Sequence, residues 1–156
     1  MNTRGVCSVL VTALMYLALP QELSLADMSE KWVVVVRPSN PVRTLKRSEL
    51  DRIYRRTTRF WNDPAALTPA LPILPINLPP GDPLREAFSR TILRADDDML
   101  STWWNRQYFQ GVLPPIVLRS AAAVRAYVAA TPGAIGYLPP DLVDSSVAVV
   151  TVDEGN

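Results

Sequence analysis

The sequence contains no histidine, and its single cysteine, Cys7, lies close to the N-terminus. Histidine is the side chain that most often acts as a general base and as a metal ligand near neutral pH, so its absence excludes Ser-His-Asp and Cys-His catalysis. A lone cysteine excludes internal disulfides and disfavours a zinc enzyme. A catalytic site would need carboxylates, Lys46 and tyrosines, and no spacing brings such groups together. We therefore expect a protein that binds rather than catalyses, without a cofactor.

The first 26 residues have the pattern of a secretory signal peptide. Arg4 supplies a positive charge, residues 5–20 are uncharged and mostly apolar, and Ser24 and Ala26 are small residues at the −3 and −1 positions of a cleavage site. The alternative is an N-terminal membrane anchor, but the apolar stretch is shorter than the ~20 residues of a spanning helix. We therefore predict cleavage after Ala26, export to the periplasm and no stable membrane insertion. Cys7 is not at the cleavage junction, so we expect no lipid anchor.

Positive charge is concentrated between residues 37 and 59, where only Glu49 and Asp51 oppose it. The basic residues there are Arg37, Arg43, Lys46, Arg47, Arg52, Arg55, Arg56 and Arg59. Such a segment suits an oxyanion, an acidic protein surface or lipid headgroups, although a solvated helix face without a partner has the same pattern. Nucleic acid is disfavoured as a partner, because the product is exported and the basic residues are not interleaved with aromatic ones.

Strand-like and helix-like segments alternate along the chain. The β-branched run at residues 32–36 indicates a strand that is buried on both faces. Further strands are expected at 73–77, 115–118, 134–137 and 147–152, and helices at about 45–54, 82–92, 96–111 and 120–132. This alternation predicts one α/β domain over residues 27–156, with a mostly parallel or mixed sheet of about five strands and helices on both faces.

The stretch INLPPGDPLREAF, residues 76–88, leads from an expected strand through a glycine turn into an expected helix. Free N–H groups at such a helix start often hold an anion. Here Asp82 suits the N-cap position and Pro83 the first helical position, and Glu86 can close a capping box. Pro83 has no N–H to offer, and Asp82 places a negative charge where an anion would lie. We therefore predict a self-capped helix start, with Arg85 either at the surface or in reach of an anion.

Three other features have both a binding and a structural interpretation. Ser39 and Asn40 follow the first expected strand at the end where open α/β sheets place ligands, but they also suit an ordinary chain reversal. The three aspartates at residues 96–98 could coordinate Ca²⁺, although helix capping also explains them and no loop-ligand pattern follows. Trp103 and Trp104 would point about 100° apart on a helix, so one could pack in the core while the other contacts a partner protein, although the same pattern also fits two core residues.

Two stretches carry a resemblance to a known family. VVVVRPSNPVRTLKRSELDRIYRRTTRFW is similar to a valine-rich strand, an Asn-Pro turn, a Leu-x-x-x-x-Leu-x-x-Ile-[Phe/Tyr] helix and a tryptophan in the periplasmic phosphate-binding proteins of ABC importers. GAIGYLPP is similar to the Pro-Gly-Ala-Ile-Gly-Tyr segment late in those proteins. The resemblance covers residues 32–152. It implies a periplasmic-binding-protein type II-like fold, of which this chain would hold one of the two lobes.

The resemblance also implies a solute-binding function with phosphate or another oxyanion as ligand. That family holds phosphate on an Arg-x-x-Ser-Gly-Thr-type loop at a helix start, and residues 77–85 correspond to it without the hydroxyl groups. The candidate ligand-binding residues are Ser39, Asn40, Gly81, Asp82 and Arg85. The candidate basic interaction patch consists of Arg52, Arg55, Arg56 and Arg59.

A single lobe could act in two ways. It could bind an oxyanion weakly by itself, or pair with a second copy as a homodimer that rebuilds a two-lobed cleft. The alternative function is a ligand-less accessory or sensory module of the cell envelope. Such a module would present its basic helix or its tryptophan-containing helix to an envelope protein partner.

Overall fold

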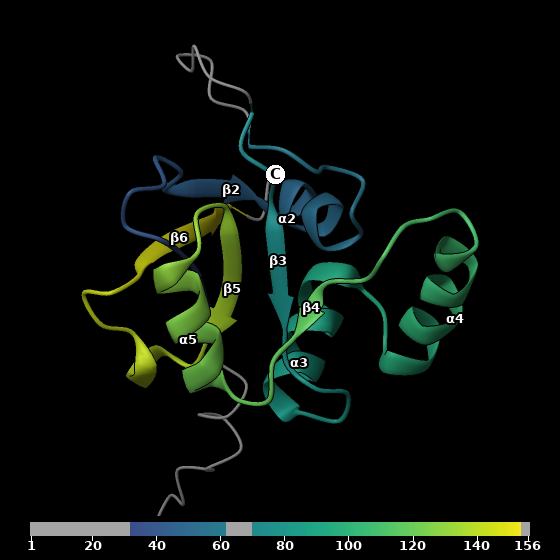
Figure 1. The fold of residues 1–156 in the computed structure, drawn as a ribbon. Helices are drawn as coiled ribbons and strands as arrows, with labels where there is room; N and C mark the ends of the chain where they lie inside the picture. The colour runs from purple at the N-terminus through teal and green to yellow at the C-terminus, as the bar shows by residue number, and fades with distance from the viewer. Residues whose placement is uncertain (1–31, 62–69, 154–156) are drawn as a thin grey trace, which may run out of the picture.

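The protein forms one mixed β-sheet of six strands in the order β2-β6-β1-β5-β3-β4 (Figure 1). The computed structural model describes residues 32–61 and 70–153, so the predicted signal peptide lies outside the described residues. The strands are β1 (Val33–Val36), β2 (Thr44–Lys46), β3 (Leu74–Asn77), β4 (Ile116–Val117), β5 (Ala134–Leu138) and β6 (Ala148–Asp153). β1 is antiparallel to β5 and β6, and the other neighbouring pairs are parallel. The predicted α/β class is confirmed; β2 was not predicted.

Helices occupy each of the four places that the sequence indicates. They are α2 (Arg47–Tyr54), α3 (Pro83–Phe88), α4 (Asp97–Tyr108) and α5 (Ala121–Ala130). A π-helical segment, η1 (Ser89–Leu93), continues α3, and a short 3₁₀ turn, η2 (Pro140–Leu142), precedes β6. None of the helices in the described part of the chain is long and apolar enough to span a membrane.

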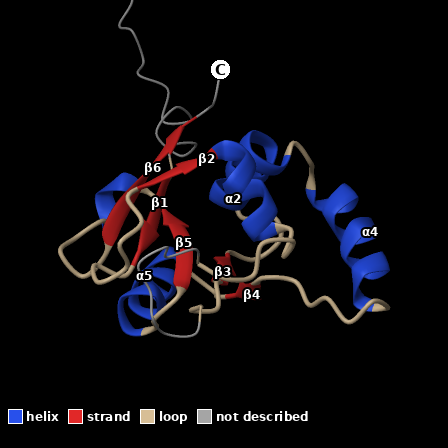
Figure 2. Cartoon of the chain, turned by 90° about the horizontal axis from the view of Figure 1, so that it is seen from above, coloured by secondary structure: helices blue, strands red, loops and turns tan. Residues whose placement is uncertain are grey.

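The two faces of the sheet are covered by different helices (Figure 2). Successive residues of a strand point to opposite faces. In β5, Gly136 faces Val124 and Val128 of α5, whereas Tyr137 faces the other side. There its ring stacks on Phe88 of α3, with 4.1 Å between ring centroids. α5 therefore covers one face, and α2 with α3 covers the other.

An aromatic cluster joins α2 and α3 to the centre of the sheet. The ring of Phe88 lies 4.6 Å from that of Tyr54 and 5.1 Å from that of Trp32, centroid to centroid. The buried Tyr54 hydroxyl donates to the backbone oxygen of Ile76 (3.0 Å), and the Tyr137 hydroxyl donates to Asn77 Oδ1. Burial raises the pKa of both phenols above the ordinary value for tyrosine, so both remain neutral donors. These bonds fix the end of β3.

α4 stands apart from the sheet in both views (Figures 1 and 2). Only Leu100 of this helix is buried, and Trp104 packs partly buried against the core. Trp103 lies instead beside Arg55, whose guanidinium carbon is 5.4 Å from the ring centroid. Of the two interpretations, the one in which a single tryptophan packs against the core is observed, and the one in which both do is wrong. A polar contact at its first turn, made by Asp97, also holds α4.

Substitution of Gly136 tests how closely α5 lies on the sheet. A Cβ at this position would lie 2.6 Å from Val124 Cγ1 and 3.2 Å from Val128 Cγ2. We expect Gly136→Ala to lower the free energy of unfolding by about 1–3 kcal/mol, because the valines must move. Urea denaturation measures this. Val124→Ala in the same chain should make the Gly136→Ala change less costly; an equal cost in both backgrounds would contradict the packing described here.

Candidate functional site

The turn between β3 and α3 is self-capped, as predicted. Asp82 is the N-cap of α3, and its Oδ1 accepts hydrogen bonds from the backbone N–H groups of Leu84 (2.9 Å) and Arg85 (3.3 Å). Pro83 occupies the first turn of the helix. Gly81 has a φ of +80°, a conformation that glycine adopts without strain. The donors at the start of this short helix are therefore satisfied by the chain itself.

Arg85 is buried, with 8% of its surface exposed, so the interpretation of it as a surface residue is wrong. Its Nη1 donates to the backbone oxygen of Leu78 (2.8 Å), and its Nε donates to Asp97 Oδ1 (3.1 Å). A buried guanidinium group needs both hydrogen-bond acceptors and a counter-charge, and this geometry supplies both. Arg85 thus ties the end of β3 to the first turn of α4.

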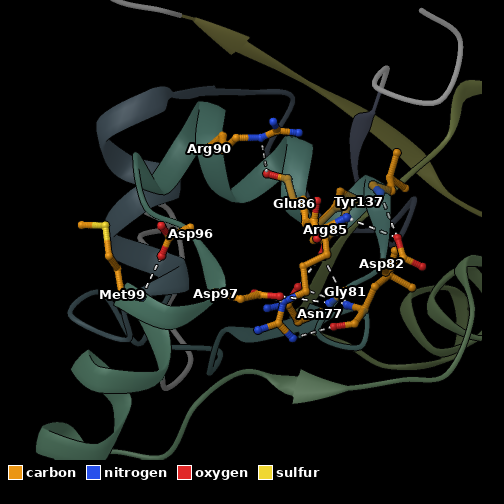
Figure 3. Close-up of polar contacts among 12 residues, drawn as sticks. Asn77, Gly81, Asp82, Arg85, Glu86, Arg90, Asp96, Asp97, Met99 and Tyr137 are labelled. Carbon is orange, nitrogen blue, oxygen red and sulfur yellow. Dashed lines mark hydrogen bonds and ion pairs between the residues drawn. The ribbon is translucent and has the colours of Figure 1, made fainter. Parts of the chain in front are cut away.

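Asp97 lies where the sequence led us to consider a bound anion (Figure 3). Its Oδ2 accepts a hydrogen bond from the Gly81 N–H (3.0 Å), while its Oδ1 accepts from Arg85. Its neighbour Asp96 caps α4 by accepting from the backbone N–H of Met99 (2.8 Å). The capping prediction for this acidic run therefore applies to Asp96, while Asp97 turns towards the β3–α3 turn. Sequence reasoning missed this contact.

A cleft of about 400 Å³ adjoins this ion pair. Its wall includes Asn77 at the end of β3, Arg85, Asp97, and Ser101 and Trp104 on α4. Asp98, Pro80, Pro114, Pro115 and Val117 complete the wall. The cleft thus carries one guanidinium group and two carboxylates. No group of three metal-binding side chains exists among the described residues, so the Ca²⁺ interpretation of residues 96–98 gains no support.

Ser39 and Asn40 lie at the opposite end of the strands from Arg85. Because β1 is antiparallel to β5, and β5 is parallel to β3, the carboxyl ends of β1 and β3 point in opposite directions. Asn40 is buried, and its Oδ1 accepts from the backbone N–H of Val42 (2.9 Å), as in a chain reversal. The structure therefore brings together Gly81, Asp82 and Arg85 but separates them from Ser39 and Asn40.

The arginines of the expected basic patch make different contacts with the rest of the protein. Arg56 has a φ of +61° and donates to the backbone oxygen of Ile73 (2.8 Å). Its pKa is lowered, first by burial and then by the charge of Arg59. Arg55 pairs with Asp51 (2.9 Å) and donates to the backbone oxygen of Leu93 (2.7 Å). Arg52 is exposed on α2.

Arg55 instead belongs to a second cleft, of about 440 Å³, between α2, η1 and α4. Two further arginines, Arg94 after η1 and Arg106 on α4, line this cleft with Trp103 and Asp98. The three arginines are far apart in the sequence, which is why charge patterning along the chain did not identify them as a group. In their shared cleft these guanidinium groups lie near an aromatic ring, with the Arg55 guanidinium carbon 5.4 Å from the ring centroid of Trp103.

Comparison with known proteins gives a fold likeness but no sequence match. No protein-family model matches the sequence, and no curated protein matches it. Among solved structures, one from Clostridium perfringens is named as a phosphate ABC transporter substrate-binding protein with bound phosphate. It is 21% identical, with a TM-score of 0.63, over 80% of this chain and 46% of its own. An ABC-type phosphate transport receptor from Vibrio cholerae is 21% identical, with a TM-score of 0.62, over 80% of this chain and 47% of its own.

A third structure is a high-affinity periplasmic phosphate-binding protein, PfluDING, bound with phosphate. It is 19% identical, with a TM-score of 0.56, over 80% of this chain and 37% of its own. The chain thus spans less than half the length of each of these three proteins. Its fold is that of a single lobe of the phosphate ABC transporter substrate-binding proteins.

Proposed function

We propose that the protein is an exported, solute-binding-type lobe that binds a small oxyanion such as phosphate weakly in the Arg85 cleft, without catalysis. One observation carries this proposal: Arg85 and the Gly81 N–H together already bind an anionic group, the Asp97 carboxylate, at 3.1 and 3.0 Å. Charge-assisted bonds of this kind are what an oxyanion requires. The fold likeness to proteins solved with bound phosphate supports the same ligand class.

The composition of the cleft supports weak rather than tight binding. Asp82 and Pro83 leave few free N–H donors at the turn, and Ser101 is the hydroxyl-bearing side chain in the cleft wall. The carboxylates of Asp97 and Asp98 would repel an incoming anion. A tighter site would need a second surface, either from another copy of the chain or from a separate lobe.

Export follows from the sequence of residues 1–26, whose charged start, apolar stretch and small residues suit a signal peptide. The name of the PfluDING structure describes that protein as periplasmic, which agrees with this location. A homodimer that closes the cleft, and an importer partner, belong to the same proposal.

Calorimetric titration with phosphate and with sulfate tests the oxyanion proposal. The mature protein should bind phosphate with a Kd on the order of 1 mM. Arg85→Gln should weaken binding at least tenfold, because it removes the charge that the anion contacts. Arg52→Gln is the matched control: it removes an exposed charge on α2 and should leave the Kd unchanged.

Circular dichroism shows whether Arg85→Gln still folds. Arg85→Lys is the charge-conserving variant and should keep more of the phosphate affinity than a neutral substitution. Absence of heat for every oxyanion with the folded wild-type protein would contradict the proposal. An unchanged phosphate affinity in folded Arg85→Gln would contradict the assignment to this cleft, and so would an unchanged affinity in Arg85→Met if Arg85→Gln does not fold.

A protein-interaction module is the second candidate function, and the arginine cleft favours it. Arg55, Arg94 and Arg106 lie around an opening next to Trp103. Large apolar side chains are exposed on the same helix and on the segment after it: Met99 (59%), Tyr108 (64%), Phe109 (89%) and Leu113 (63%). Arginines beside exposed aromatic side chains are typical of protein interfaces. The matching partner would present acidic and apolar side chains.

Fluorescence anisotropy with a labelled peptide of alternating Glu and Phe tests this second function. We expect binding that weakens at least tenfold in Arg106→Glu and that is largely lost at about 0.5 M salt, because the contacts are electrostatic. Arg52→Glu, on the exposed face of α2, should bind the peptide like the wild type. Equal binding of a matched Lys-Phe peptide would argue against the arginine cleft as the docking site.

A further inference from the structure

We infer that Asp97 is an internal competitor that determines how strongly the Arg85 cleft takes up an oxyanion, and that oxyanion binding releases the first turn of α4. The inference rests on the proposed oxyanion function and adds the residue that controls affinity. The carboxylate is that of Asp97 on α4, and the two donors are the Arg85 Nε–H and the Gly81 N–H.

The contacts show the competition directly. Arg85 directs its Nε to Asp97 Oδ1 at 3.1 Å, and its Nη1 is engaged by the backbone oxygen of Leu78 at 2.8 Å. The Gly81 N–H donates to Asp97 Oδ2 at 3.0 Å. An oxyanion that uses the same two donors must displace this carboxylate (Figure 3). The two anionic groups therefore exclude each other.

Capping of α4 does not require Asp97. Asp96 is the N-cap residue, and its Oδ1 accepts from the Met99 N–H at 2.8 Å. Asp97 is 27% exposed in its side chain, compared with 10% for the Arg85 side chain, so water and ions reach the carboxylate side of the pair. The pair is therefore accessible from the cleft and can open without exposing the protein core.

α4 is built so that loss of this contact would loosen it. Leu100 is its only buried residue, and Trp104 is partly buried. In the first turn, the buried Leu100 and the contacts of Asp97 with Arg85 and Gly81 together attach the helix to the rest of the protein. Segments with few buried contacts open at low cost. Displacement of Asp97 by an oxyanion is consequently transmitted to α4 and to the exposed aromatic residues at its far end.

The fraction of molecules in which the Asp97–Arg85 pair is formed determines how much the pair lowers the affinity for an oxyanion. If the internal pair is formed 90–99% of the time, the apparent affinity for an external oxyanion is reduced by about 10- to 100-fold. Removing the competitor should restore that factor. A role of Asp97 limited to neutralising Arg85 predicts a different result, namely lower stability with no gain in oxyanion affinity.

The test compares Asp97→Asn and Asp97→Ala with Asp98→Asn in calorimetric titrations with phosphate and sulfate at constant ionic strength. Asp98 is the adjacent carboxylate on the same cleft wall, so its variant removes an equal charge without removing a competitor. We expect both Asp97 variants to bind phosphate at least tenfold more tightly than the wild type. Asp98→Asn should stay within about threefold.

Hydrogen exchange of the α4 amides provides the second measurement. Phosphate should speed exchange in the first turn of α4 in the wild type, whereas in Asp97→Ala this turn should exchange fast with or without phosphate. Equal phosphate affinities of the wild type and both Asp97 variants, or an equal gain in Asp98→Asn, would overturn the inference while leaving the proposed function in place. If no variant binds phosphate or sulfate, the proposed function itself fails.

Discussion

The burial of one guanidinium group governs the arrangement of this site. Arg85 lies on the first turn of α3 and is buried, so its charge would cost several kcal/mol without partners. The chain supplies a backbone oxygen from Leu78 and a carboxylate from Asp97. Through these partners Arg85 links the segment after β3 to the first turn of α4. The cleft owes its position to the same pair, because its walls are the turn, the end of β3 and α4.

The same constraint determines which donors of the β3–α3 turn are already occupied. The turn keeps donors for an anion, but Asp82 satisfies the helix start and Asp97 satisfies Arg85 and Gly81. The protein thus carries its own anionic group, the Asp97 carboxylate, at the place where we propose that an oxyanion binds. The same carboxylate lies on a helix that also exposes the apolar side chains of Met99 and Tyr108. Solute binding and protein contact therefore meet on α4, which is why both remain candidate functions.

The sequence predicted those features of the structure that depend on interactions between residues close together in the chain. The capping role of Asp82 and Pro83, and the buried run in β1, depend on neighbours within a few residues, and both were predicted. The antiparallel direction of β1, which separates Asn40 from Arg85, depends on pairing with β5 far along the chain. The contact of Asp97 with Arg85 also depends on how α4 folds back. Neither is visible in composition or periodicity.

The most direct test of this account is an NMR titration of the mature protein with phosphate. It follows the backbone amide resonance of Gly81 and the Nε–H resonance of Arg85. Both should shift together and saturate with the same Kd, and in Asp97→Asn they should saturate at a phosphate concentration at least tenfold lower. Unmoved Gly81 and Arg85 signals at phosphate concentrations that shift other residues would contradict the central claim that these two groups hold the anion.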